Sequence, residues 1–289
     1  MAVVAPIVYD CLSAILGTSS IDFTVLNGGS INNAFQLTTT KQRFFCKMNS
    51  ATKFPHLFER EAKGLSFLEK QGIFKTPRVI QVAEAGSYQL LLLEWIDNAT
   101  PAPAFWKSFG AQLAALHTIT QKHFGLDIDN YMGAVPQTNT PSAEWSSFFI
   151  DQRLSPLVAK CYSLQYLTAR HVTQFHYLYT HIPAIFNLEP PSLLHGDLWS
   201  GNYLCAKDQQ PTLIDPAIYF GHRSMDLGMT TLFGGFDKTF YEAYTYHCPL
   251  PTNFREQWEV SNLYPLLIHL LLFGKSYLPS IERTLNDFQ

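Results

Sequence analysis

The sequence predicts an α+β chain of two lobes, a small lobe with an antiparallel sheet and one helix, and a larger, mainly helical lobe. Short strand-like runs rich in β-branched and aromatic residues fill the first 96 residues, whereas apolar residues recur at helical spacing from residue 105 onward. No internal repeat, low-complexity segment or long linker interrupts the 289 residues. We therefore expect one folded unit whose lobes comprise residues 1–96 and 97–289.

Composition excludes several classes of protein. Hydrophobic residues make up 47% of the chain and aromatic residues 14%, which is typical of a folded core rather than of disorder. The formal net charge of −3 offers no basic surface for nucleic acid or for an acidic membrane. We expect small molecules or proteins as partners, and neither nucleic acid nor a membrane. The oligomeric state is left open.

The cysteines and the apolar segments bear on the compartment. The five cysteines are scattered and lack a C-x-x-C pair, so we interpret them as reduced thiols rather than as disulfides or a zinc site. The first residues lack the basic and apolar segments of a signal peptide. The apolar stretch Leu263–Phe273 is interrupted by Pro265 and His269 and is too short to span a bilayer. These observations favour the cytoplasm.

The first lobe is expected to contain five strands and one helix. The helix runs from residue 55 to 71, where apolar residues recur at helical spacing and Gly72 provides a stop. The strands are expected at Asp22–Leu26, Asn33–Thr38, Arg43–Asn49, Val79–Ala83 and Tyr88–Trp95.

Two adjacent glycines separate the first two of these strands. Gly28 and Gly29 would let the backbone approach a phosphate closely, and Ser30 and Asn32 would add hydrogen-bond donors. The segment matches neither the P-loop pattern nor the G-x-G-x-x-G of protein kinases. A plain hairpin turn is the alternative.

A lysine lies within the third strand. Lys47 shares a strand face with Phe45, and an ammonium on a buried face needs a partner. Glu61 falls on the apolar stripe of the following helix, so the two side chains are expected to pair. The alternative is a lysine whose stem alone is buried and a glutamate at the surface.

Helices are expected to dominate the second lobe. Residues 105–118, 144–160 and 164–186 have helical patterns, residues 124–140 are predicted to form a long ordered loop, and several helices follow residue 236. His117 lies on the apolar stripe of the first of these helices, so we interpret it as a core histidine with no catalytic role.

Three polar residues follow short apolar runs near residue 200. Asp197 and Asn202 share one loop, and Asp215 ends an apolar run eighteen residues after Asp197. Carboxylate and amide oxygens are ligands that a hard cation prefers, and a carboxylate can also orient an attacking hydroxyl. Turn chemistry, in which Asp and Asn cap their own backbone, is the alternative for the loop pair.

This arrangement resembles the catalytic loop of the protein-kinase-like fold. The resemblance implies phosphoryl transfer from ATP with Mg²⁺, in which Asp197 accepts the hydroxyl proton while Asn202 and Asp215 bind the metal. Lys47 and Glu61 would be the ion pair that positions the phosphates.

The same resemblance assigns a hinge between the lobes. The run of residues 90–97 would be the last strand of the small lobe, leading into a hinge before Pro101 and Pro103. The backbone of such hinges binds the adenine edge, and the candidates here are Glu94, Trp95 and Ile96.

The residues of several motifs are similar to those of the fructosamine kinase (ketosamine kinase) family, whose members are relatives of aminoglycoside phosphotransferases. The likeness covers nearly the whole chain. The motifs that carry it are His195–Asn202, Asp215–Ala217, Asp226–Leu227, Leu232–Phe236, Gly28–Asn32, Phe44–Lys47, Phe124–Asp127 and Pro191–Leu194.

Membership of this family implies ATP-dependent phosphorylation of the 3-hydroxyl of a ketosamine, a sugar joined to an amine or a protein lysine by glycation. The phosphorylated adduct is unstable, so the reaction implies deglycation and protein repair. Trp199 would stack on the sugar, with lobe packing as the alternative. Asp226 would accept backbone donors from the catalytic loop, with a helix N-cap as the alternative.

Two departures from related patterns limit what is carried over. Ser30 stands where some family members have a cysteine that links two subunits, so that redox behaviour is not expected here. Asp215-Pro216-Ala217 replaces the Asp-Phe-Gly of protein kinases, so a switch that flips a phenylalanine is not expected either.

Other functions remain open from the sequence. A kinase of another small hydroxylated substrate, of the aminoglycoside or choline kinase type, would share the catalytic residues. A nucleotide-binding pseudokinase or a purely structural module would not need this set of residues.

Overall fold

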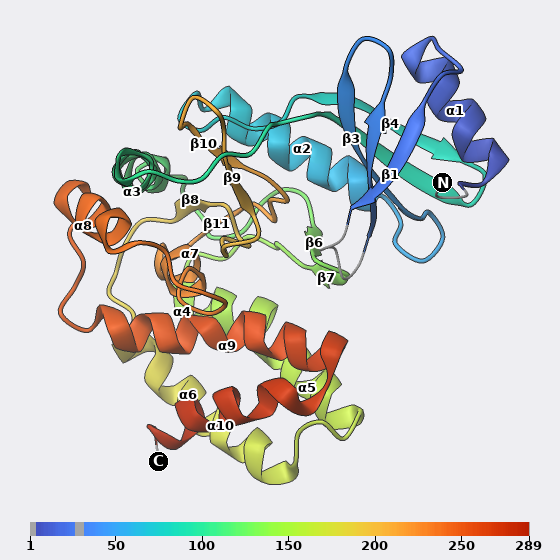
Figure 1. Ribbon diagram of the computed structural model, residues 1–289. Coiled ribbons are helices and arrows are strands. Elements are labelled where there is room, and N and C mark those ends of the chain that lie inside the picture. The colour runs from blue at the N-terminus through green and yellow to red at the C-terminus, as the bar shows by residue number, and fades with distance from the viewer. Residues whose placement is uncertain (1–3, 27–31, 289) are drawn as a thin grey trace. The chain divides into compact units, whose positions relative to one another are not determined.

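The computed structural model describes residues 4–26 and 32–288. The chain forms two compact units, one of residues 1–100 with 204–216 and the other of residues 101–203 with 217–289 (Figure 1). The boundary expected after residue 96 stays a prediction, and it did not anticipate that residues 204–216 fold with the first unit.

A five-stranded antiparallel sheet forms the centre of the first unit. Its strands lie in the order β1-β2-β3-β5-β4, and adjacent strands pair in antiparallel register. All five were expected from the sequence. Their bounds are β1 Asp22–Leu26, β2 Asn33–Thr38, β3 Arg43–Ser50, β4 Val79–Ala85 and β5 Tyr88–Glu94.

Strand alternation divides the sheet into two faces. Phe44 and Cys46 of β3 belong to a core cluster with Val8 and Leu12 of helix α1, Pro6–Leu16, which the sequence analysis did not identify. Lys47 points to the opposite face because its position in β3 has the other parity. Helix α2, Leu57–Lys70, was expected and packs against β4 and β5.

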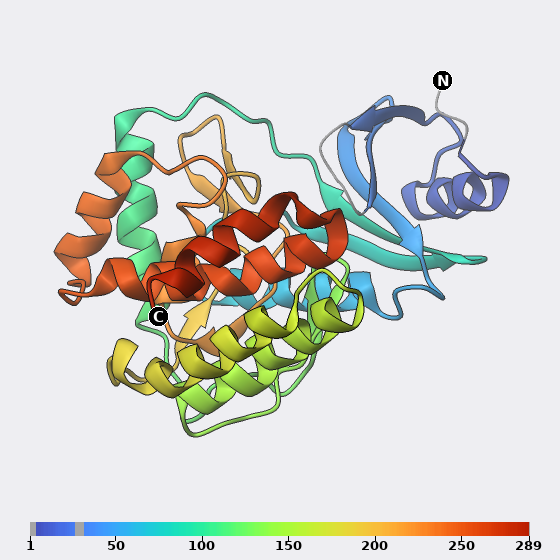
Figure 2. The same cartoon turned by 90° about the horizontal axis from the view of Figure 1, so that it is seen from below.

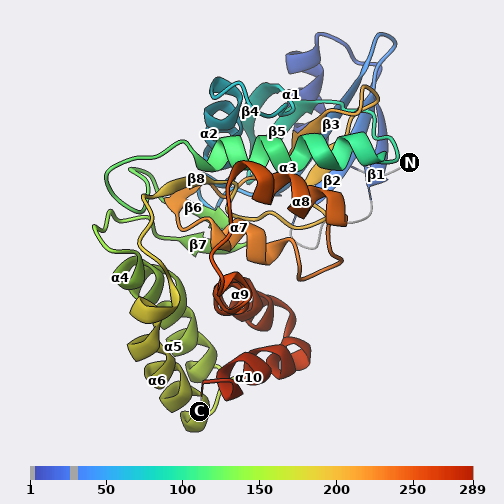
Figure 3. The same cartoon turned by 90° about the vertical axis from the view of Figure 1, so that its left-hand side faces the viewer.

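Helices make up most of the second unit, as predicted. Their bounds are α3 Pro103–His117, α4 Trp145–Phe149, α5 Ser155–Ser163, α6 Ala169–Ile185, α7 Ser224–Met229, α8 Lys238–His247, α9 Phe254–Phe273 and α10 Leu278–Asn286. Helix α3 packs lengthwise against α8 (Figure 3), and α9 packs against α5 and α10 (Figure 2).

Short strands occur in hairpins and between helices. Four of them lie in the second unit: β6 Asn130–Met132 pairs with β7 Val135–Gln137, and β8 Ser192–Leu194 pairs with β11 Tyr219–Gly221. The other pair, in the segment that leads back into the first unit, is β9 Tyr203–Cys205 with β10 Pro211–Leu213.

Three predicted elements of the second unit need correction. The loop expected at residues 124–140 contains the β6–β7 hairpin, whose three-residue strands are too short to give a periodic signal. The helix expected at 144–160 is interrupted by a π-helical turn, Ile150–Leu154, and continues to Ser163. The helix expected from residue 164 begins at Ala169, where the Thr168 side chain accepts a hydrogen bond from the backbone of His171 and caps the helix.

Cysteine and membrane expectations can be compared with the described residues. All five cysteines are free thiols. Within residues 4–26 and 32–288, none of the helices combines the length and apolar character needed to cross a membrane.

A glycine allows α3 and α8 to pack closely. A Cβ atom built on Gly110 would lie 2.1 Å from the carbonyl oxygen of Phe240 and 2.9 Å from the backbone nitrogen of Tyr244. We therefore expect Gly110→Ala to lower the free energy of unfolding by about 1–3 kcal/mol, because the helices must separate. In an unobstructed helix the same change would stabilise by roughly 1 kcal/mol.

Chemical denaturation of Gly110→Ala alongside Gly235→Ala measures this effect. A Cβ at Gly235 has no neighbour within 4 Å, so that control should unfold near the wild-type midpoint. Equal stability of the wild type and Gly110→Ala would contradict the close approach of the two helices.

Candidate functional site

A buried lysine joins two carboxylates in the first unit. The Lys47 side chain is only 4% exposed, and its Nζ lies 2.8 Å from Oε1 of Glu61 and 2.6 Å from Oδ1 of Asp215. The predicted pairing of Lys47 with Glu61 is confirmed. The contact with Asp215 was not predicted, because that residue was considered only as a metal ligand.

The two carboxylates compete for one ammonium. Burial alone would lower the pKa of Lys47, but the charges of Asp215 and Glu61 outweigh burial and raise the pKa above its ordinary value. Burial raises the pKa of Glu61, and the like charge of Asp215 adds to this rise, while Lys47 opposes it. Lys47 therefore stays protonated.

Asp215 has an unusual backbone conformation. Its φ angle is +54°, in the left-handed region where Asp is one of the few tolerated residues other than glycine. Such a conformation costs about 1–3 kcal/mol and persists only where the surroundings hold it. The ion pair with Lys47 is one such restraint.

The hairpin that ends at Asp215 is held within the first unit by backbone hydrogen bonds. Ala99 N–H donates to the carbonyl of Cys205 at 2.7 Å, and Leu213 N–H donates to the carbonyl of Lys75 at 2.9 Å. These bonds hold the hairpin so that Asp215, which follows it, lies next to Lys47.

Part of the predicted phosphate loop can be located. Gly28, Gly29 and Ser30 lie outside the described residues. Asn32 is described, and its Oδ1 accepts a hydrogen bond of 2.6 Å from Nδ2 of Asn49, in β3. The start of β2 is thereby tied to the strand that carries Lys47.

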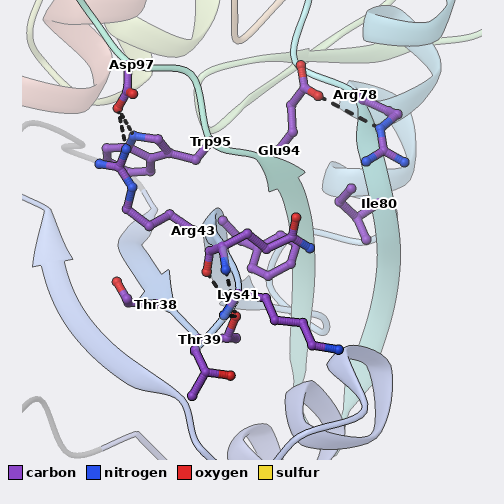
Figure 4. A pocket seen from close by; sticks show the side chains of 12 residues that line it. Thr38, Thr39, Lys41, Arg43, Arg78, Ile80, Glu94, Trp95 and Asp97 are labelled. Atoms are coloured by element: carbon purple, nitrogen blue, oxygen red, sulfur yellow. Dashed lines mark hydrogen bonds and ion pairs between the residues drawn. The ribbon is translucent and has the colours of Figure 1, made fainter.

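Polar contacts fix the predicted hinge at the end of β5. Asp97 accepts hydrogen bonds from Arg43 at 2.7 Å and from the Trp95 indole at 2.9 Å (Figure 4). Lys207 lies 2.8 Å from its other oxygen. The hydrogen bonds from Lys207, Trp95 and Arg43 lower the pKa of Asp97 to about 2. The hinge is therefore tied to both β3 and the β9–β10 connection.

These contacts limit what the hinge can offer a nucleotide base. The Glu94 amide already donates to the carbonyl of Arg78 at 3.0 Å, so its carbonyl is the group left for a ligand. The Trp95 side chain is occupied by Arg43 and Asp97. The contribution of Trp95 and Ile96 would come from their backbone, as the sequence analysis proposed.

A hollow of about 630 Å³ lies beside this hinge, and Figure 4 shows the side chains that line it. It is lined by residues 38–44, Arg78, Ile80 and hinge residues. Phe44 and Ile80 belong to the core cluster on the α1 side of the sheet. The hollow therefore opens on the face opposite Lys47.

A buried aspartate anchors the loop of residues 195–202 in the second unit. The carboxylate of Asp226, in α7, accepts hydrogen bonds from the backbone N–H groups of His195 at 2.7 Å and Gly196 at 2.9 Å. The predicted acceptor role of Asp226 is confirmed. His117 Nε2 lies 3.3 Å from the same carboxylate and its Nδ1 lies 2.8 Å from the hydroxyl of Tyr244, so His117 is the buried, satisfied histidine that was expected.

Position 196 in this loop requires glycine. Gly196 has a φ angle of +84°, and a Cβ there would lie 2.1 Å from the carbonyl oxygen of Ala217. The Ala217 N–H donates to the carbonyl of His195 at 2.9 Å. The loop therefore packs directly on the segment that follows Asp215 in the chain.

Asp197 and Asn202 contact one another as their spacing suggested. Asn202 Nδ2 donates to the backbone carbonyl of Asp197 at 2.8 Å and to its Oδ2 at 2.9 Å. The Asp197 N–H donates to Nδ1 of His195 at 3.2 Å. Because the amide nitrogen of Asn202 is used within the loop, its oxygen is the atom presented to a ligand.

The donor set agrees with the chemistry of magnesium. Asn202 in the second unit and Asp215 in the first supply an amide oxygen and a carboxylate, and Mg²⁺ commonly takes few protein ligands together with phosphate oxygens and waters. In the part of the chain that the structure describes, no three His, Cys, Asp or Glu residues cluster as a closed metal site. Each residue taken by itself is of a type that fits an open magnesium site, and their joint role as ligands stays a prediction.

Trp199 has a packing role within its own unit. Its ring meets the ring of Phe233 edge to face at a centroid distance of 5.8 Å. A Cβ at Gly201 would lie 2.3 Å from the Trp199 ring. Packing thus accounts for the orientation of the indole, and stacking on a sugar stays a prediction.

Sequence reasoning missed a polar network around residues 217–218. Asn130 donates to the carbonyl of Ile218 at 2.8 Å, and Gln137 donates to that of Ala217 at 3.2 Å. Asn139 accepts from the fully buried Arg153 at 2.6 Å. The residues lie in the predicted loop and in the π-helical turn, and no periodicity marks them in the sequence.

Comparison with known proteins relates this geometry to one family. A model of the fructosamine kinase family matches residues 8–289. A probable ketoamine kinase of Lactiplantibacillus plantarum is 37% identical over 268 residues, 91% of this chain and 92% of the relative. The chloroplastic protein-ribulosamine 3-kinase of Arabidopsis thaliana is 33% identical, and the match covers 91% of this chain and 81% of that protein.

Solved structures agree with this relationship. One from Thermobifida fusca YX-ER1, which carries a fructosamine-3-kinase designation, has a TM-score of 0.87 at 29% identity and covers 97% of this chain and 98% of its own. An aminoglycoside phosphotransferase in a ternary complex with AMP-PNP and hygromycin B has a TM-score of 0.66 at 12% identity over 97% of this chain and 96% of its own, which shows a shared fold. The chain therefore has the α+β protein-kinase-like fold predicted from its sequence, and it belongs to the fructosamine kinase family.

Proposed function

We propose that this member of the fructosamine kinase family transfers a phosphoryl group from ATP to the 3-hydroxyl of a ketosamine and thereby initiates deglycation. The observation that carries the proposal is the Asp197–Asn202 pair, held in a loop whose backbone is anchored by Asp226. The buried Lys47–Glu61–Asp215 cluster supports nucleotide use. The relatives named for ketoamine and ribulosamine kinases support the acceptor class.

In this mechanism each side chain has a distinct task. Asp197 accepts the proton of the acceptor hydroxyl, and Asn202 holds the Asp197 carboxylate through its amide nitrogen. Lys47 places a fixed positive charge for the nucleotide phosphates, and Glu61 orients it. Asn202 and Asp215 would be the ligands of Mg²⁺, and the metal would supply positive charge to the phosphates.

The hinge and the glycine-rich segment complete the proposed nucleotide site. We assign the adenine edge to the backbone of Glu94, Trp95 and Ile96, and the phosphates to the segment that contains Gly28, Gly29, Ser30 and Asn32. The substrate would be a glycated amine or a glycated protein lysine, and the cytoplasm is the proposed location.

The first test is Mg²⁺-dependent ATP consumption with ribulose-lysine and fructose-lysine, compared with an aminoglycoside. We expect turnover with the ketosamines only. Asp197→Ala should lower kcat by about 10²–10⁴-fold and leave ATP binding intact, because a general base acts in the reaction and not in docking. Asp208→Ala, an exposed aspartate outside the site, is the control.

Turnover with the aminoglycoside alone would favour a kinase of another hydroxylated substrate. Bound ATP without turnover on any acceptor would favour the pseudokinase alternative. Unchanged kcat in Asp197→Ala would remove Asp197 from its assigned role.

A second prediction concerns Lys47. Lys47→Met should lower kcat/KM for ATP by roughly 100-fold, which corresponds to about 2.7 kcal/mol of lost transition-state stabilisation. It should also destabilise the fold, since Glu61 and Asp215 are left without the ammonium they share.

The double variant Lys47→Met/Glu61→Gln separates these two effects. It should recover thermal stability, because one stranded charge is removed, without recovering activity. Lys63→Met, an exposed lysine on α2, is the matched control. Recovery of activity in the double variant would show that Lys47 acts only on stability.

A third prediction concerns the metal. Asp215→Asn keeps the size of the side chain but removes the charge, so the Mg²⁺ concentration that gives half-maximal activity should rise by about tenfold or more. A titration of activity with Mg²⁺ at saturating ATP measures this value, with Asp208→Asn as control. A magnesium requirement equal to that of the wild type would mean that Asp215 is not a ligand.

A further inference from the structure

A continuous set of aromatic rings extends from the catalytic loop. We call it the aromatic strip and define it as Phe233, His269, Phe273 and Tyr277, all in the second unit. The ring centroid of His269 lies 4.7 Å from that of Phe233, 5.0 Å from that of Tyr277 and 5.4 Å from that of Phe273. His269 is therefore the centre of the strip.

One end of the strip is fixed to the catalytic loop. The ring of Trp199, two residues after Asp197, contacts the ring of Phe233. The hydroxyl of Ser200 donates to the backbone carbonyl of Phe233 at 3.1 Å. The other end reaches solvent, since Phe273 is 43% exposed. The strip thus leads from Trp199, which follows Asp197 in the same loop, to the surface of the unit at Phe273.

The protonation of His269 is set by its surroundings. Its Nδ1 lies 2.8 Å from the carbonyl oxygen of Pro265, which can only accept, so Nδ1 carries the hydrogen. Burial lowers the pKa of His269 and favours the neutral ring. Nε2 then presents a lone pair, and the described residues place no hydrogen-bond donor on it.

This combination of groups is suited to an alkylammonium ion. Aromatic faces attract cations through the charge distribution of the ring, and the Nε2 lone pair can accept a hydrogen bond from N–H⁺. A ketosamine carries such a group, because the sugar is joined to its carrier by a secondary amine that is protonated near neutral pH, as a lysine amine is.

We propose that the aromatic strip binds the protonated linking amine and the carrier arm of the ketosamine, with His269 Nε2 accepting from the amine. The inference rests on the proposed function, since it concerns the acceptor of the same site. The sugar lies toward Trp199 and Asp197, and the carrier runs past His269 to Phe273. When the carrier is a lysine of a protein substrate, the rest of that protein can lie outside the site, beyond Phe273.

The test compares two acceptors that differ in one atom. One is fructose-lysine with an acetylated α-amine, and the other is the same compound with an ether oxygen in place of the linking amine. Wild-type enzyme should use the amine with a kcat/KM at least about tenfold above that of the ether. His269→Phe keeps an aromatic ring but lacks the acceptor, so it should raise KM for the amine, leave the ether unaffected and retain the KM for ATP.

The matched control is His181→Phe on α6. Its Nδ1 lies 3.0 Å from the carbonyl of Tyr177, four residues earlier, and its ring centroid lies 4.5 Å from that of Tyr177, so it reproduces the local setting of His269 at a partly exposed position outside the aromatic strip. This variant should keep the amine preference. Equal use of the two acceptors by wild-type enzyme, or an equal loss for both in His269→Phe, would overturn the proposal.

Failure of the proposed function can be told apart from failure of this inference. Phosphorylation of both acceptors at the same efficiency leaves the kinase function intact and overturns only the amine site. If neither acceptor is phosphorylated, the proposed function fails, and calorimetric titration of both compounds into the wild-type protein decides the inference. Tighter binding of the amine than of the ether supports recognition of the ammonium, and equal binding contradicts it.

Discussion

The sharing of one buried ammonium between two carboxylates is the interaction on which the first unit depends. Lys47 can occupy the inner face of the sheet only because Glu61 and Asp215 neutralise it. Glu61 requires α2 to pack with a fixed rotation, and Asp215 requires residues 204–216 to return from the second part of the chain. A single buried charge thus determines the position of a helix and of a hairpin.

In the second unit, hydrogen bonds to a buried carboxylate, rather than ion pairs to a buried ammonium, hold the candidate residues in place. The loop of residues 195–202 is held by backbone donors that converge on the buried carboxylate of Asp226, itself next to His117. Asn202 holds the side chain of Asp197 within the loop. Backbone groups position the loop and the Asn202 side chain orients the Asp197 carboxylate, so the geometry does not depend on any one long, flexible residue.

The sequence predicted best those features that follow from a regular apolar pattern, or from the need of a buried charge for a partner of opposite sign. The five strands of the sheet and helix α2 follow from alternation and helical spacing, and the Lys47–Glu61 contact follows from placing both residues on apolar faces. Helix α1 was missed because the N-terminal segment was considered only for signal-peptide features. The π-helical turn at residues 150–154 was missed because its apolar spacing continues that of the flanking helices. The contacts of Asp215 with Lys47, and of Asn130 and Gln137 with residues 217–218, join segments far apart in sequence, and no local pattern reports them.

The free thiols have a practical consequence for studying the protein. Burial raises the pKa of Cys46 to about 12 and that of Cys161 to about 11, and Cys205 is also buried with a raised pKa. These three sulfurs stay protonated and shielded at neutral pH, so they react slowly with alkylating reagents. The partly exposed thiols are Cys11 in the first unit and Cys248 in the second. The native chain therefore offers one labelling position on each unit, and a pair of dyes attached there can measure the distance between the units with and without ATP.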